Sequence, residues 1–178
     1  MKASGFAIAI AAAAATITTA RVAQAGYPTH YAWTTPAAGC QLTSTTTAHT
    51  PIFDATYGEV DFVDGDTGTY HLACPITALN YNINPTGFNY TYNDEGTGCA
   101  ITGTVRYHSR ASGTFGTVAT ATATSSGSAP YLLSVGAGIS PAFDVETNFY
   151  WVDFAVTRTS ASVVYCSVNS ATLSIPLF

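Results

Sequence analysis

Hydrophobic and polar residues alternate along two neighbouring segments near the middle of the chain, and this alternation predicts two β-strands. In residues 58–63, Val60 and Phe62 share one face, and Glu59 and Asp61 share the other. In residues 69–76, every second residue is apolar and predicts a buried face: Tyr70, Leu72, Cys74 and Ile76. The acidic run DGDTG between them predicts a tight turn, because glycine adopts positive φ freely and aspartate bonds to its own backbone. The whole stretch therefore predicts a β-hairpin.

Similar short segments continue along the chain, separated by turns rich in glycine, proline and asparagine. The segments are residues 41–50, 88–92, 98–108, 114–124, 131–135, 149–158, 162–168 and 172–178. In segment 162–168 the pattern places Val164, Cys166 and Val168 inward. After residue 25 no segment has convincing helical periodicity. Many short strands with turn signals between them predict a single-domain, all-β, antiparallel sandwich that is jelly-roll-like.

The N-terminus has the features of a secretory signal peptide rather than of a folded element. Lys2 precedes an apolar run over residues 5–17, and Ala23-Gln24-Ala25 forms an A-x-A cleavage pattern. The run is too short for a membrane span, and a packed N-terminal helix is the alternative interpretation. We therefore expect a signal peptide over residues 1–25, a β-sandwich domain over residues 26–178, and a secreted or periplasmic protein.

The charge of the expected mature chain restricts the class of partner. Residues 26–178 contain no lysine, and three arginines stand against ten acidic residues, which gives a net charge of −7. A surface so poor in cations cannot neutralise phosphate groups, so nucleic acids and anionic membranes are not expected partners. No second apolar run reaches the length of a membrane span.

An even number of cysteines behind a signal peptide predicts two disulfides. The cysteines are Cys40, Cys74, Cys99 and Cys166, and their spacing matches no zinc-binding pattern. Cys74 and Cys99 are both expected on inward faces, and the termini of a sandwich often lie near each other. Of the three possible pairings we therefore predict Cys74–Cys99 and Cys40–Cys166.

The order of these features resembles a group of small, secreted, uncharacterised bacterial proteins. The resemblance lies in Cys40, Cys74-Pro75-Ile76, Asn93-Asp94, Cys99-Ala100-Ile101 and the aromatic run Phe149-Tyr150-Trp151. Here the last cysteine departs from the pattern, because it lies in the final strands rather than in the aromatic strand. The resemblance implies a β-sandwich and supplies no activity.

The segment around Glu59 is the best lead to an enzymatic activity. It resembles the E-x-D-x-x-E strand of the laminarinase-like glycoside hydrolases, which are jelly rolls, and Glu59, Asp61 and Asp64 occupy the three acidic positions. In that family the first Glu is the nucleophile, the Asp tunes it, and the last Glu is the acid/base. A retaining mechanism needs two carboxyls about 5–5.5 Å apart. However, Asp64 is a methylene shorter than Glu, strict alternation turns it to the other face, and a solvated strand face is the alternative.

Two further groups of residues suggest binding. Asp64 and Asp66 in the acidic turn supply carboxylates for a calcium site, and a plain hairpin turn is the alternative. Phe149, Trp151 and Asp153 form an outward-facing aromatic and acidic stripe that suits a sugar ring, and a strand buried on both faces is the alternative.

The sequence therefore supports three functional hypotheses. The first is a secreted, non-catalytic β-sandwich with a binding or structural role outside the cytoplasm, whose partner is a glycan or another extracellular protein. The second is a carbohydrate-active protein, either a carbohydrate-binding module or a degenerate laminarinase-like glycoside hydrolase. The third is a pilin-like subunit, for which residues 26–39 would serve as the donor strand. No cofactor other than calcium is expected.

Overall fold

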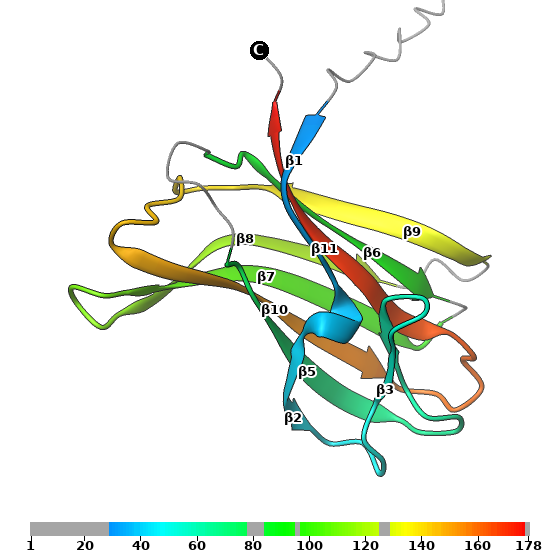
Figure 1. Cartoon of the computed structure of the whole chain (residues 1–178). Coiled ribbons are helices and arrows are strands. Elements are labelled where there is room, and N and C mark those ends of the chain that lie inside the picture. Colours follow the sequence, from blue (N-terminus) through cyan, green and yellow to red (C-terminus); the bar gives the residue numbers. More distant parts are fainter. Residues whose placement is uncertain (1–28, 78–83, 95–96, 125–128, 177–178) are drawn as a thin grey trace, which may run out of the picture.

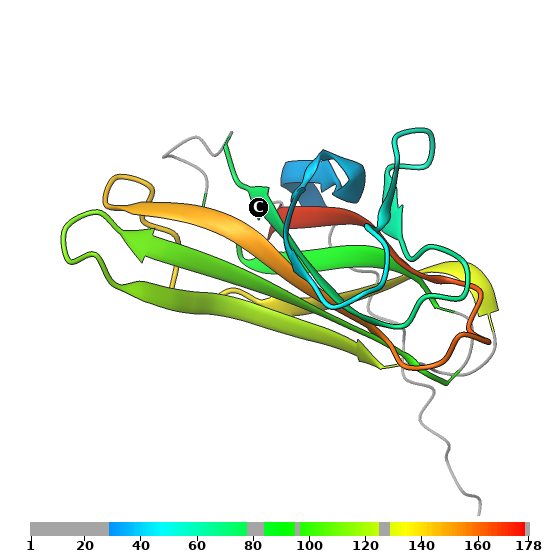
Figure 2. The same cartoon turned by 90° about the horizontal axis from the view of Figure 1, so that it is seen from below.

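The computed structural model describes residues 29–77, 84–94, 97–124 and 129–176, which form a β-sandwich of two antiparallel sheets (Figures 1 and 2). The predicted signal peptide, residues 1–25, lies outside the described residues. Among the described elements no helix is long and apolar enough to span a membrane. The prediction of an all-β sandwich with two disulfides is confirmed.

Each sheet is built from strands that are distant in the sequence (Figure 1). Sheet A has the order β3 (Ile52–Asp54), β4 (Glu59–Asp61), β11 (Cys166–Pro176), β6 (Gly87–Asp94) and β9 (Ala129–Gly138), and β1 (Thr29–Pro36) also pairs with β11. Sheet B has the order β2 (Gln41–Thr45), β5 (Gly68–Pro75), β10 (Asn148–Arg158), β7 (Cys99–Ser109) and β8 (Phe115–Thr124). A short 3-10 turn, η1 (Ala37–Gly39), connects β1 to β2.

The inward faces of the two sheets form the core, and two tyrosines cross it. The Tyr70 hydroxyl, from sheet B, donates a hydrogen bond to the Val60 carbonyl of sheet A at 2.6 Å. The Tyr90 hydroxyl, from sheet A, donates to the Ile101 carbonyl at 2.6 Å and accepts the Ala123 N–H at 2.9 Å, both in sheet B. Because a buried hydroxyl without a partner costs free energy, these bonds allow two large amphipathic rings to lie in the core.

The middle of the core is packed against a glycine. Gly103 lies on the inward face of β7, and a Cβ atom added there would lie 2.9 Å from ring atoms of Phe154, Phe88 and Tyr90. Three aromatic rings therefore occupy the space that a side chain at residue 103 would fill. This packing explains a glycine inside a strand, where glycine is otherwise unfavourable.

The predicted hairpin around DGDTG is wrong, although both strands and the turn exist. β4 belongs to sheet A and β5 belongs to sheet B, so the two strands do not pair with each other. Residues 62–67 instead carry the chain across the sandwich from one sheet to the other. Alternation identifies which face of a strand is buried, but two strands packed face to face have the same alternation as two strands paired side by side.

The predicted disulfide pairing, Cys74–Cys99 and Cys40–Cys166, is also wrong. The bonds are Cys40–Cys74 and Cys99–Cys166. β10 lies between β5 and β7 in sheet B and therefore separates Cys74 from Cys99. β2 pairs directly with β5, which brings Cys40 beside Cys74, whereas the Cys99–Cys166 bond joins β7 of sheet B to β11 of sheet A.

The last two predicted strands are one strand, and it begins later than expected. Val164 is 57% exposed rather than inward, and Val163 is buried in its place. β11 then continues without interruption from Cys166 to Pro176, with a register shift between Val168 and Ser170.

The segment proposed as a pilin-like donor strand is paired within its own chain. Over residues 29–36 it forms β1, which runs antiparallel beside β11 (Figure 1). The first and last described strands are therefore neighbours, as sandwich termini often are.

Candidate functional site

The outer face of sheet B carries the aromatic stripe that the sequence predicted on β10. Tyr150, Val152 and the following alternate residues are buried, so Phe149, Trp151 and Asp153 point outward. Phe149 is 56% exposed, and Trp151 and Asp153 are partly exposed. The alternative of a strand buried on both faces therefore does not apply at this end of β10.

The strand register adds side chains from β7 and β8 to this stripe. Phe149 pairs with His108, which in turn pairs with Phe115 on β8. The Phe115 ring is 70% exposed, its centroid lies 4.5 Å from that of His108, and it meets Trp151 edge-to-face at 6.2 Å. Phe115, Phe149 and Trp151 thus share one face with His108; we call this set, together with the Arg106–Asp153 pair described next, the aromatic face.

Two arginines give the aromatic face its polar character. Arg106 pairs with Trp151 in the register, and its Nε atom lies 2.9 Å from an oxygen of Asp153. The guanidinium of Arg110 lies 4.1 Å from the centroid of the Phe149 ring. Arg110, Phe149 and Trp151 also line an adjacent pocket of about 530 Å³. The face can therefore stack a planar or ring-shaped ligand and donate hydrogen bonds to it at the same time.

Sequence reasoning identified one strand of this face and missed the other two. Arg106 and His108 alternate with inward residues in the predicted strand 98–108, so their outward direction was readable. Their position beside β10 was not readable, because it depends on which strands pair. Phe115 was missed for the same reason.

The carboxylates of the glycosidase-like segment lie on the other sheet and in two environments. Glu59 and Asp61 flank the buried Val60 on β4 and therefore share the outer face of sheet A, as predicted. One oxygen of Glu59, Oε2, accepts hydrogen bonds from Asn93, Ser167 and Asn169 at 3.0, 3.1 and 3.0 Å. Asp64 lies beyond the strand, exposed in the crossing segment. The three acidic positions therefore do not lie on one strand.

The surroundings of Asp61 change its pKa. Burial raises its pKa to about 6, and the negative charge of Glu59 adds to the rise, although hydrogen bonds from the Phe62 and Cys166 backbone act in the opposite direction. The Phe62 N–H donates to Asp61 Oδ1 at 2.7 Å. Asp61 thus prefers to be protonated in slightly acidic solution, where an exposed aspartate is ionised.

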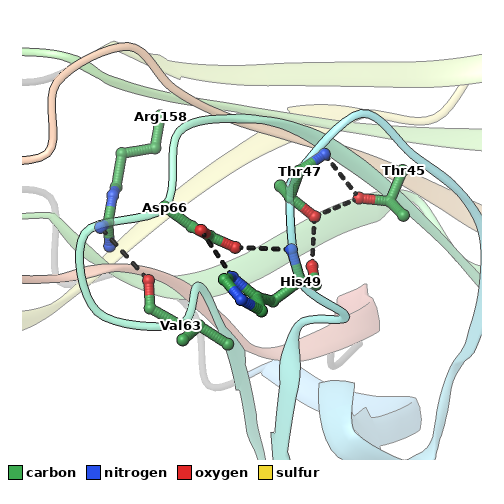
Figure 3. Close-up of polar contacts among 6 residues, drawn as sticks. All are labelled: Thr45, Thr47, His49, Val63, Asp66 and Arg158. Carbon is green, nitrogen blue, oxygen red and sulfur yellow. Dashed lines mark hydrogen bonds and ion pairs between the residues drawn. The ribbon is translucent and has the colours of Figure 1, made fainter.

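The predicted calcium turn uses its buried carboxylate within the fold. Figure 3 shows Asp66 directed at His49, whose backbone N–H and ring Nδ1 each lie 2.9 Å from a different Asp66 oxygen. The hydrogen bond from the His49 ring is the main cause that lowers the pKa of Asp66. Arg158, only 2% exposed, lies inside the same loop and donates to the Val63 carbonyl at 3.4 Å. Asp66 therefore holds residues 62–67, which cross between the sheets, against His49 in the segment before β3.

Within the part of the chain that the structure describes, no group of three or more His, Cys, Asp or Glu side chains is arranged to hold a metal ion. Asp64 and Asp66 differ in their surroundings, since Asp64 is exposed and Asp66 is buried. The contacts of Asp66 thus favour a structural role for the turn.

Comparison with known proteins gives limited similarity. No protein-family model matches the chain, and no curated protein matches it. Among solved structures, a family 6 carbohydrate-binding module is 17% identical, with 79% of this chain and 92% of that chain covered and a TM-score of 0.45. A beta-1,3-glucan-binding CBM6 from Bacillus halodurans is 14% identical, with 83% and 95% covered and a TM-score of 0.40. Similarity at this level assigns no function to the chain.

Proposed function

We propose that the chain is a secreted, non-catalytic carbohydrate-binding protein and that the aromatic face is its binding surface. The proposal rests on one observation: three partly or largely exposed rings, Phe115, Phe149 and Trp151, share a face with an arginine that is held by a carboxylate. Exposed rings on a soluble domain are costly unless they serve an interaction. Rings that stack on a sugar, with charged donors beside them for its hydroxyl groups, are a suitable combination for a glycan.

The rigidity of the aromatic face also supports the proposal. All its members lie on β7, β8 and β10, which pair along most of their lengths. A site on paired strands loses little conformational entropy when a ligand binds. The Arg106–Asp153 ion pair further restricts the guanidinium, so its remaining N–H groups have a defined direction.

A binding role agrees better than a hydrolytic role with the contacts of the glycosidase-like segment. Glu59 is bound by three side-chain donors on one oxygen, and Asp64 lies outside β4. The predicted signal peptide and the two disulfides support secretion, because disulfides persist in oxidising compartments.

The proposal is tested by titrating the mature chain, residues 26–178, with a panel of soluble neutral and uronic-acid polysaccharides in a calorimeter. We expect at least one glycan to bind, and Trp151→Ala to weaken its binding at least tenfold, or about 1.4 kcal/mol. Phe53→Ala is the matched control, because Phe53 is a comparably exposed aromatic residue on β3 of the other sheet. It should leave the affinity unchanged.

Two results would overturn the proposal. One is the absence of binding across the panel, or binding that Trp151→Ala does not weaken. The other is release of reducing sugars from a β-glucan that stops in Glu59→Gln, since this would show a glycoside hydrolase instead.

A further inference from the structure

The outer face of sheet A contains a second, chemically different concavity, which we call the Glu59 groove. Its volume is about 770 Å³, and it lies between the end of β1, the turn between β3 and β4, and the residues that precede β11. Glu59, Asn93 and Asn169 form its floor, with Tyr57 and Tyr165 among the residues that line it. It does not include any residue of the aromatic face.

Three neighbouring strands build the floor of the groove. Val60, Val168 and Tyr92 are paired across β4, β11 and β6 and point into the core. The residues beside them in sequence therefore point outward and meet above the sheet, and this brings Asn93, Ser167 and Asn169 to the Glu59 carboxylate. The three donors all bind the Oε2 oxygen, at 3.0–3.1 Å, so the carboxylate is held in one orientation.

The charge of Glu59 has no cationic partner in the groove. None of the residues that line the groove is basic, and the ion pairs found among the described residues do not include Glu59. The three neighbours that bind Oε2 are neutral amides and a hydroxyl, which orient the carboxylate but leave its negative charge uncompensated. A partly buried charge of this kind favours a cation at short distance.

The aromatic residues of the groove suit the same kind of ligand. Tyr57 is 73% exposed and Tyr165 is 44% exposed, and the face of a tyrosine ring attracts a cation. Asn169 is 9% exposed, and its Oδ1 atom is buried without a hydrogen-bond partner among the described residues. The groove thus combines a fixed carboxylate with two exposed rings, and the Asn169 amide oxygen lies beneath its surface.

We propose that the Glu59 groove binds the protonated amine of an unacetylated amino sugar. Glu59 compensates the charge of the ammonium group, and Tyr57 and Tyr165 lie against the sugar ring. The Thr34 hydroxyl and the hydrogen-bonded hydroxyls of Thr91 and Ser170 face the hydroxyls of the sugar. A calcium ion needs six to eight oxygen ligands, whereas the groove offers a single carboxylate, so an ammonium group is the better match. The site is independent of the aromatic face and of the function proposed for that face.

The experiment compares two ligands that differ in whether the amine is free and protonated or acetylated and neutral. The mature chain is titrated with short glucosamine oligomers and with the corresponding N-acetylglucosamine oligomers, at a mildly acidic pH that protonates the free amine. We expect the glucosamine oligomer to bind at least tenfold more tightly. Glu59→Gln should remove most of this preference, whereas Trp151→Ala should leave it unchanged, so a failure of this site is distinct from a failure of the aromatic face.

A charge-matched control is needed because the chain is acidic and the glucosamine oligomer is a polycation. Glu146→Gln removes one negative charge from an exposed residue that does not line the groove. It should leave the affinity unchanged, and an equal loss in both variants would mean adhesion through net charge and would overturn the proposal. If Glu59→Gln does not fold, Tyr165→Leu takes its place, with an expected threefold to tenfold loss.

Three other outcomes would also reject the site. They are equal affinity for the two oligomers, saturable binding of calcium chloride alone at the same groove, and binding of a lysine peptide in preference to the amino sugar.

Discussion

The two outer faces of the sandwich contrast in how they are built and in the charge they carry. On sheet B, the rings of the aromatic face are brought together by strand register, with the Arg106–Asp153 ion pair among them and Arg110 beside them. On sheet A, the Glu59 groove has an acidic group at its floor, which is held by three neutral donors. The same sandwich thus presents exposed rings with cations on one side and a recessed carboxylate on the other.

Under the two proposals, one fold offers two kinds of recognition without a change of backbone. A flat face with exposed rings recognises the shape of a ligand, and many sugars share that shape. A recessed carboxylate with fixed donors recognises the charge of a ligand, which few sugars have. Mutations on one face, on both faces or in the core between them should separate the recognition of shape, the recognition of charge and the stability of the fold.

The largest expected effect comes from disconnecting the two sheets. Cys99→Ala with Cys166→Ala removes the bond that joins β7 to β11 and opens a loop of 67 residues, which should lower the free energy of unfolding by about 4 kcal/mol on the chain-entropy model. Urea denaturation of the double variant measures the loss. Both binding sites should then disappear in a single transition at lower urea. A loss below about 1 kcal/mol would contradict the expected role of the bond.

The next effect concerns only the sheet that carries the groove. The folded-state pKa of Asp61 is raised from 3.8 to about 6, so the folded protein binds this proton more tightly than the unfolded chain does. Its stabilising contribution is therefore complete below pH 3.8 and is lost as the pH rises through about 6. Asp61→Asn should remove this dependence and raise the free energy of unfolding above pH 6 by up to about 3 kcal/mol. Thermal unfolding of both proteins across this range measures the difference, and parallel pH profiles would contradict it.

A change in the core should affect stability without favouring either face. Gly103→Ala would place a methyl group 2.9 Å from three aromatic rings, and the strain should cost about 1–3 kcal/mol. Gly138→Ala is the matched control, because no atom lies within 4 Å of its Cβ position and the strand conformation suits alanine. We expect denaturation curves to shift for the first variant only. Unchanged stability in Gly103→Ala would mean that the rings can move apart at little cost.

The smallest expected effect concerns the charge of the aromatic face. Arg110→Gln removes the cation that lies 4.1 Å from the Phe149 ring, and the loss of this exposed contact should cost about 0.5–1 kcal/mol of stability. Affinity for a uronic-acid polysaccharide should fall severalfold, whereas affinity for a neutral one should change little. Titration with both ligands checks this, and an equal fall for both would show that Arg110 acts through the ring instead of through its charge.

Most strands and their buried faces were predictable from the sequence, because alternation depends only on neighbouring residues. The outward direction of Phe149, Trp151 and Asp153 was therefore predicted correctly. The segment before β11 is an exception, since Val163 is buried there instead of Val164. Strand pairing was not predictable, because it depends on contacts between residues that are far apart in the chain. The wrong hairpin and the wrong disulfides share this cause, since the first assumed that adjacent segments pair and the second assumed which strands lie side by side.

The candidate sites were also predictable only in part, and for the same reason. Glu59 was singled out from its position in an acidic strand, but the three donors that bind it come from β6 and β11, more than 30 residues away. Arg106 and Phe115 were missed because Trp151, which lies beside both of them, follows them by 45 and 36 residues in the chain (151 − 106 and 151 − 115). Composition gave one further indication. Residues 26–178 contain three arginines, so two of them beside the same group of rings indicate a binding surface once the register is known.

The hydroxyl of Tyr90 also bears on self-association. β8 is an edge strand of sheet B, and unpaired N–H groups along such an edge can template the addition of a strand from another molecule. Tyr90 reaches across from the opposite sheet and accepts the N–H of Ala123 on β8, and β9 lies in contact with the same strand. The same hydroxyl donates to the carbonyl of Ile101, which pairs with Ala123, so it links β8 to β7 from the opposite sheet. Separation of this end of β8 from its sheet would therefore have to break bonds to the opposite sheet as well as bonds within its own sheet.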